Sequence, residues 1–275
     1  MLALFAAGCG DDGDGSGPGS KLDDPGPVHV HGLGVNPKDG ALFIATHTGL
    51  FRAAKGEQES KRVADRYQDT MGFTVAGPDR FLGSGHPDFQ KDADLPPLLG
   101  LILSTDAGQT WRPISLLGEA DFHVLEGIGR RVYGFDSSNE RLMVSLDGGG
   151  RWSERTAPEP LISLAFEPND PKRIIGAGEN RLYASSDEGR HWRSLEGEPG
   201  LIAWPTKEQL YLVRGDGRAL FSGNSGARWT RVGDVGGQPA AFEAEGSRDL
   251  YVALHDGTVK RSVDGGRSWT VRSKP

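Results

Sequence analysis

Short hydrophobic segments follow one another along the chain from about residue 28, and turn-forming Gly, Asp, Asn and Pro residues separate them. Two neighbouring stretches show the pattern: LISLAFEP, KRIIGAGE, NRLYASSD and HWRSLEGE are followed by LIAWPTKE, QLYLVRGD, RALFSGNS and RWTRVGDV. Segments of this length, with alternating residues and turn signals at both ends, predict β-strands. We therefore expect an all-β protein with four short strands in each repeating unit.

A short motif, S-x-D-x-G-x-x-W, marks five of these units. It reads STDAGQTW, SLDGGGRW, SSDEGRHW, SGNSGARW and SVDGGRSW, and its tryptophans recur at intervals of 37 to 41 residues. We expect the Ser and Asp side chains to bond the backbone of a hairpin and the indole ring to pack between sheets. The residues with these structural roles are Asp106, Trp111, Asp147, Trp152, Asp187, Trp192, Asn224, Trp229, Asp264 and Trp269.

The motif resembles the Asp-box (BNR) repeat of sialidase-like and sortilin-like β-propellers. Together with a first unit that lacks the motif, the resemblance implies a six-bladed β-propeller over residues 28–275. Its blades are expected to be four-stranded and antiparallel, with the Asp boxes in the hairpins between third and fourth strands. A seven-bladed ring is the rival, but no seventh unit remains in the chain. HVHGLGVNP, DTMGF and GSGHPD also resemble an exported bacterial subgroup labelled sialidase-like or glycosylhydrolase-like.

The amino-terminal segment MLALFAAGCG is apolar and ends at Cys9, the only cysteine of the chain. It resembles a bacterial lipobox, although Ala6 replaces the usual Leu and no basic segment precedes it. Residues 10–27 are polar and Gly-rich, as in a flexible tether. We expect residues 1–9 to be a signal-peptide remnant and the protein to be exported and lipid-anchored on the extracytoplasmic face. A chance apolar terminus is the alternative.

Alignment of the six units gathers most histidines into two columns. The first strands contribute His31, Met71 and His123 on three adjacent blades. The ends of the second strands contribute His47, His86 and His255, and His29 lies in the loop that leads into the first blade. In a propeller both columns surround the axis on one face, opposite the Asp boxes. Imidazole suits zinc and copper, and a thioether favours copper.

We therefore predict a metal site from His31, Met71, His123, His47 and His86, with copper preferred over zinc. We expect His29 and His255 to contribute to ligand binding on the same face. A site for a small polar ligand without metal, and a purely structural role, are the alternatives. The insertion HPDFQKDADLPPLLG after His86 is expected to lie on this face, where such loops commonly cover a site. Its aspartates are spaced too loosely for a calcium loop.

The sialidase-like label implies three arginines, a tyrosine nucleophile with a Glu partner, and an Asp acid/base. Neither column contains an arginine. The five tyrosines are expected on second or third strands or before blade 2, outside both columns, so we do not expect sialidase activity. Asp136, Glu179 and Asp216 lie at second-strand ends and could serve another glycosidase as acid and base. The alternative is that they only form turns.

We therefore expect a binding protein rather than an enzyme. A third possibility is an assembly scaffold at a membrane surface, because Asp-box propellers that resemble sortilin or photosystem assembly factors bind protein partners. The net charge of −7 argues against non-specific binding of nucleic acid. We expect a monomer with a membrane anchor and a possible protein partner.

Overall fold

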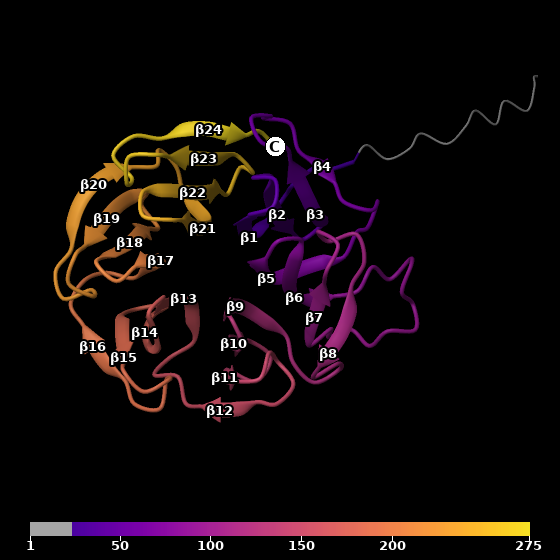
Figure 1. Ribbon diagram of the computed structural model, residues 1–275, viewed down its shortest axis with the longest axis horizontal. Helices are drawn as coiled ribbons and strands as arrows, with labels where there is room; N and C mark the ends of the chain where they lie inside the picture. The colour runs from indigo at the N-terminus through magenta and orange to yellow at the C-terminus, as the bar shows by residue number, and fades with distance from the viewer. Residues whose placement is uncertain (1–23) are drawn as a thin grey trace, which may run out of the picture.

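Six small sheets surround a central axis like the blades of a propeller (Figure 1). The computed structural model describes residues 24–275, so Cys9, the predicted signal remnant and most of the predicted tether lie outside the described residues. Each sheet has four antiparallel strands, which confirms the predicted all-β, six-bladed architecture. The described residues include no helix that is long and apolar enough to cross a membrane.

The strands alternate in direction and are short, as the turn-rich sequence predicts. Blades 1 to 3 contain β1 (Val30–Val35), β2 (Leu42–Thr46), β3 (Gly49–Ala53), β4 (Lys61–Arg62), β5 (Asp69–Gly77), β6 (Arg80–His86), β7 (Leu101–Ser104), β8 (Arg112–Ser115), β9 (Phe122–Ile128), β10 (Arg131–Asp136), β11 (Arg141–Ser145) and β12 (Ser153–Arg155). Blades 4 to 6 contain β13 (Leu161–Glu167), β14 (Asp170–Gly178), β15 (Leu182–Ser185), β16 (Arg193–Leu195), β17 (Gly200–Thr206), β18 (Gln209–Arg214), β19 (Arg218–Ser222), β20 (Thr230–Asp234), β21 (Pro239–Glu245), β22 (Asp249–Leu254), β23 (Val259–Ser262) and β24 (Thr270–Ser273).

Each blade uses four consecutive strands, and its first strand lies innermost. The innermost strands contact one another in order around the axis, and β21 contacts β1 to complete the ring. Hydrophobic side chains fill the space between neighbouring blades. Between blades 1 and 2, for example, Phe81 packs against Phe43 and Phe73 with ring centroids 4.7 Å and 5.5 Å away. Burial of this apolar surface between blades is what drives the ring to form.

The five S-x-D motifs form hairpins with the backbone bonding that their sequence predicts. In blade 4 the Ser185 hydroxyl accepts a hydrogen bond from the Gly189 amide at 2.9 Å, and Asp187 Oδ1 accepts one from the His191 amide at 2.9 Å. The other four hairpins repeat these contacts, with Asn224 using its amide oxygen in blade 5. The five tryptophans are half-buried against the hydrophobic clusters between blades.

Among residues 24–275 no strand is exchanged between the first and last blades, and contacts of side chains and backbone hold these two blades together. Arg272, next to the outer edge of blade 6, donates to the backbone carbonyls of Ala54 and Glu57 in blade 1. The Lys274 amide donates to the Gln58 carbonyl at 3.0 Å. Blades 1 and 6 also share one hydrophobic cluster. These contacts oppose separation of the two ends of the ring.

We predict that Arg272→Ala lowers the free energy of unfolding by about 1–3 kcal/mol, because the part-buried carbonyls of Ala53 and Ala54 lose a charged donor. Thermal or urea unfolding followed by circular dichroism measures the change. Arg193→Ala is the matched control, since Arg193 is an exposed outer-strand arginine with no side-chain hydrogen bond to the described residues. Equal stability of the two variants would contradict a closing role for Arg272.

Candidate metal centre

One residue of the innermost strand lacks a partner in the second strand in five of the six blades. In β1 the register shifts between Val30 and Gly32 and leaves His31 unpaired. The equivalent unpaired residues are Met71, His123, Ile162 and Ala240. An extra residue of this kind redirects its side chain. Alignment of the six units in the sequence placed His31, Met71 and His123 in this column, and the structure places four of its members around a small axial cavity of about 80 Å³: His31, His123, Ile162 and Ala240.

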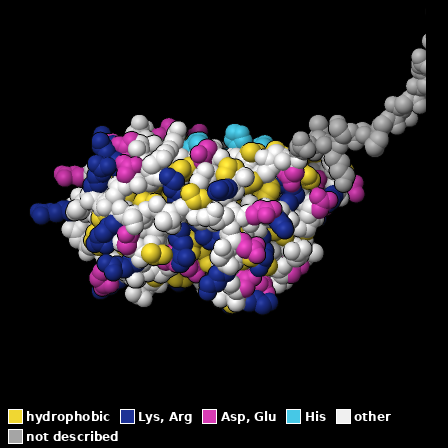
Figure 2. Space-filling view, turned by 90° about the horizontal axis from the view of Figure 1, so that it is seen from above, with side chains coloured by type: hydrophobic (Ala, Val, Ile, Leu, Met, Phe, Trp, Pro, Cys, Tyr) yellow, Lys and Arg dark blue, Asp and Glu magenta, His cyan; other side chains and the backbone are white. Residues whose placement is uncertain are grey.

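The predicted second column also forms on this face. His86 ends β6, while His47 and His255 directly follow β2 and β22. Strands alternate in direction, so the starts of the first strands and the ends of the second strands meet on one face, and the S-x-D hairpins lie on the other. Histidine side chains accordingly gather along one edge of the disc when it is seen from the side (Figure 2). We call this surface the histidine face.

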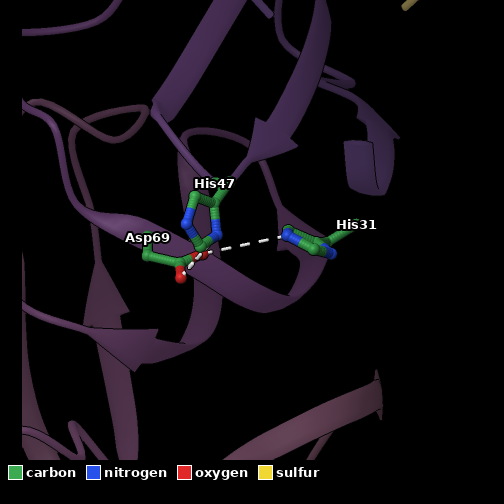
Figure 3. Close-up of side chains that lie close together, drawn as sticks. All are labelled: His31, His47 and Asp69. Atoms are coloured by element: carbon green, nitrogen blue, oxygen red, sulfur yellow. Dashed lines mark ion pairs between the residues drawn. The ribbon is translucent and has the colours of Figure 1, made fainter. Parts of the chain in front are cut away.

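His31, His47 and Asp69 converge on the histidine face at the border of blades 1 and 2 (Figure 3). One ligand atom from each residue lies within 4.8 Å of the others. His47 Nδ1 is 2.9 Å from Asp69 Oδ2, and His31 Nε2 is 3.8 Å from Asp69 Oδ1. His31 Nε2 and Asp69 Oδ1 are both buried and have no hydrogen-bond partner among the described residues. Two unsatisfied ligand atoms therefore lie close together.

The surroundings of this cluster oppose charge on two of its members. Burial lowers the pKa of His31 to about 4, and the neighbouring His47, His123 and His29 act in the same direction. Burial also raises the pKa of the Asp69 carboxyl above its usual value, against the opposing effect of nearby histidines. His31 is therefore neutral at pH 7, the form in which imidazole binds metal ions.

A second cluster lies at the next blade border and consists of His86, Asp121 and His123. His123 Nε2 is 2.8 Å from Asp121 Oδ2, and His86 Nε2 is 3.8 Å from the same oxygen. The Asp121 side chain is only 7% exposed, and its Oδ1 has no partner among the described residues. His86 Nδ1 lies 2.8 Å from the Pro97 carbonyl, so this nitrogen carries the proton and Nε2 faces Asp121 with its lone pair when the ring is neutral.

Close backbone packing holds the two aspartates in place. Gly85 has a φ of +132°, and a Cβ at this position would lie 2.2 Å from the Asp69 carbonyl, so only glycine allows β6 to approach β5 here. The Asp121 amide donates to Asp136 Oδ1 at 3.1 Å, and the next amide, that of Phe122, donates to the Ser84 hydroxyl at 2.9 Å. The start of β9 is thus bonded to two other strands.

Asp69 and Asp121 were not predicted as site residues. Each lies two residues before a member of the first column, in the segments DTM and DFH, so the same spacing occurs in two consecutive blades. This repeated spacing was the sequence signal that could have identified the two aspartates as site residues. Aspartate is common beside turns, however, and its contact with the second-strand histidine of the preceding blade depends on tertiary structure.

The remaining predicted ligands lie on the same face but outside the two clusters. Met71 is half-buried two residues after Asp69. His29 is exposed, with its ring centroid 6.1 Å from that of His47. His255 is exposed at the end of the second strand of blade 6, and its side chain makes no hydrogen bond or ion pair with residues 24–275. The roles of these three residues stay predictions.

The blade 2 insertion contacts the segment that joins blades 1 and 2, and two of its three aspartates have structural partners. Asp88 is buried and accepts hydrogen bonds from the backbone amides of Tyr67 and Gln90. Asp92 pairs with Arg66. These contacts fix the segment whose Pro97 carbonyl orients His86.

The three carboxylates considered for a glycosidase lie in different settings. Asp136 is fully buried, and besides the Asp121 amide its carboxylate accepts hydrogen bonds from Asn139 and Arg141. Glu179 is exposed after β14. Asp216 accepts a hydrogen bond from the Arg218 amide. Two of the three thus have bonds typical of turn or buried structural residues, and the catalytic assignment stays a prediction.

A pair of glutamates lies deeper along the axis, beyond the histidine face. Glu126 of blade 3 and Glu243 of the opposite blade 6 both line the small axial cavity and the larger one below it, of about 380 Å³. Burial, and then the charge of Glu243, raise the pKa of Glu126 well above its usual value. Burial raises the pKa of Glu243 to about 7, and the charge of Glu245 acts in the same direction.

The protein is similar to assembly factors and to glycosidases that share its fold. It is 30% identical to the photosystem II assembly lipoprotein Ycf48 of Synechococcus sp. (strain CC9902) over 132 residues, which are 42% of this chain and 40% of that protein. The structure of YCF48 bound to D1 peptide superposes with a TM-score of 0.56 at 14% identity, covering 90% of this chain and 82% of that one.

A GH74 xyloglucanase from Xanthomonas campestris is a similar solved structure from another class of proteins. It superposes with a TM-score of 0.57 at 20% identity, covering 89% of this chain and 45% of that one. No protein-family model matches the sequence. At these identities the structural similarities establish the propeller fold, and the sequence match spans less than half of the curated relative.

We predict that Glu243→Gln changes how stability depends on pH. A carboxyl with a pKa of about 7 in the folded state binds more protons there than in the unfolded chain, so wild-type stability falls as pH rises from about 4.5 to about 7. The variant loses much of this decline and is more stable than wild type at pH 8, by on the order of 1 kcal/mol. Urea unfolding at several pH values measures the difference.

The control for this experiment is Glu208→Gln, because Glu208 is exposed in the turn between β17 and β18 and lines neither axial cavity. Its stability profile should follow that of wild type. Parallel profiles for Glu243→Gln and wild type between pH 4.5 and 8 would show that Glu243 titrates normally.

Proposed function

We propose that this protein is an exported binding propeller that holds a divalent transition-metal ion on its histidine face. The observation that carries the proposal is the convergence of His31, His47 and Asp69, whose ligand atoms lie within 4.8 Å of one another. These residues come from two blades and from three separate places in the chain, so only the folded ring brings them together.

The spacing of the cluster fits a metal ion after small adjustments. A tetrahedral ion with bonds of about 2.1 Å separates its ligand atoms by roughly 3.4 Å. The two histidine–aspartate separations, 2.9 Å and 3.8 Å, lie on either side of that value. The His47 side chain is 61% exposed, so an ion held here keeps a position open to solvent or to a further ligand. Sites with three protein ligands commonly have this property.

The donor set favours copper or zinc in the divalent state. The expectation of copper rested on the thioether of Met71, a soft ligand that suits Cu(I). Asp69 instead adds a hard carboxylate oxygen to two imidazoles, and this combination suits Zn²⁺ and Cu²⁺. Met71 lies two residues away in the same strand and is the candidate for an additional soft ligand.

Assembly of protein partners at a membrane is the second candidate function. The match to an assembly lipoprotein and the fold of YCF48 bound to a D1 peptide favour it. The relative's designation as a lipoprotein also supports an exported, lipid-anchored protein. Purification of the full chain from solubilised membranes of its native host, by affinity tag, tests this function. Recovery of one defined partner at constant stoichiometry supports a scaffold, and recovery of the chain alone contradicts it.

We predict that the full chain binds Zn²⁺ or Cu²⁺ and that His47→Ala combined with Asp69→Asn weakens binding at this site by at least about 100-fold, since two of three ligands are lost. Isothermal titration calorimetry with each ion, and metal analysis of protein purified after export, measure the effect. Circular dichroism shows whether the variant remains folded.

His191→Ala is the matched control for this prediction. His191 is also paired with an aspartate, Asp187, but it lies in a hairpin on the opposite face and its side chain is 88% exposed. Its removal should leave tight metal binding unchanged. The proposal fails if wild type binds neither ion, or if the His191 variant and the double variant lose binding equally.

A further inference from the structure

We infer that the histidine face has a second metal position beside the first, formed by His86, Asp121 and His123. Together the two positions would bind a pair of divalent transition-metal ions across the borders of blades 1, 2 and 3. This inference extends the proposed function and rests on it, but it concerns different residues and can fail separately.

The first argument is that the histidine–aspartate pairs of the two clusters occupy equivalent places in the ring. His47 and His86 lie at the ends of the second strands of blades 1 and 2, and Asp69 and Asp121 lie at the starts of the first strands of blades 2 and 3. Each histidine therefore meets the aspartate of the following blade, at 2.9 Å in one pair and 3.8 Å in the other. The same histidine–aspartate pairing therefore recurs at two consecutive borders, while the third residue differs: His31 belongs to the blade of His47, and His123 belongs to the blade of Asp121.

The second argument is the state of Asp121. Its side chain is more than nine-tenths buried, and only Oδ2 has a partner, the His123 ring at 2.8 Å. Oδ1 is buried and accepts no hydrogen bond from the described residues. A buried carboxylate oxygen without a donor is costly, and an ion pair with His123 alone leaves that cost in place. A bound cation between this carboxylate and the two imidazoles would remove it.

The third argument is the orientation of His86. The Pro97 carbonyl accepts a hydrogen bond from Nδ1, which leaves Nε2 directed to Asp121. Metal-binding histidines are commonly held in this way, with the second ring nitrogen donating to a carbonyl. The blade 2 insertion supplies that carbonyl, and this gives the insertion a specific role on the histidine face.

The clusters are close enough for their charges to affect each other. His123 and Asp121 both act on the His31 imidazole, and His86, His123 and Asp121 act on the Asp69 carboxyl. Two cations on this face would therefore lie among two carboxylates that offset part of their mutual repulsion.

The number of Zn²⁺ ions bound by the full chain tests the inference. We expect wild type to bind two, measured by metal analysis and by calorimetric titration with Zn²⁺ alone. Asp121→Asn combined with His123→Ala should bind one, and His47→Ala combined with Asp69→Asn should also bind one. His191→Ala should bind two. His123→Ala alone, at a side chain 39% exposed, removes one of the three proposed ligands and the 2.8 Å partner of Asp121 Oδ2, and should weaken the second position by about 100-fold.

Each other outcome has a definite meaning. If wild type binds one ion that is lost only with His47 and Asp69, the second position is wrong and the proposed function stands. If one ion is lost with either pair of substitutions, a single shared site replaces the two positions. If wild type binds none, the proposed function and this inference fail together. Circular dichroism separates loss of a ligand from loss of folding, and His123→Ala decides the matter if the double variant does not fold.

Discussion

The histidine face depends on a break in strand pairing that recurs near the start of the innermost strands. Where the register shifts, one residue has no partner in the second strand, and its side chain is free to point toward the axis. His31 and His123 occupy this place in blades 1 and 3. In blade 5 the strand pairs regularly from Gly200 to Ala203, so that blade presents no such residue. The backbone geometry of the innermost strands therefore determines which side chains can point toward the axis.

The fold could be predicted because each hairpin needs the same residues for local reasons. A Ser and an Asp or Asn bond the turn within a few residues of themselves, so the requirement is visible five times in the sequence. The histidine columns followed from the same repeat. Asp69 and Asp121 escaped prediction because their significance lies in contacts with a different blade, at 2.9 Å and 3.8 Å from His47 and His86.

The hydrogen bonds already made to a buried carboxylate separate those that position the backbone from those that can bind a ligand. Asp136 was considered as a catalytic residue because it ends a second strand, yet it is fully buried and accepts hydrogen bonds from Asn139, Arg141 and the Asp121 amide. Its Oδ1 holds the start of β9, and its Oδ2 holds the hairpin between β10 and β11. Asp121 is also buried, but one of its oxygens has no donor among the described residues. The number of bonds already made to each carboxylate, and not its place in the repeat, distinguishes the two roles.

The two faces of the ring differ in how far their residues repeat from blade to blade. The hairpin face repeats one solution in five blades, because each blade needs the same turn bonded in the same way. The histidine face differs between blades, and its ligand residues are concentrated on blades 1 to 3 while Ile162 and Ala240 occupy the axial column in blades 4 and 6. A ring whose axial residues served packing alone would have no reason for this asymmetry. The imidazole–carboxylate pairs at two consecutive borders each leave a buried carboxylate oxygen without a hydrogen-bond partner among the described residues, and this asymmetry supports the proposal of a ligand on this face.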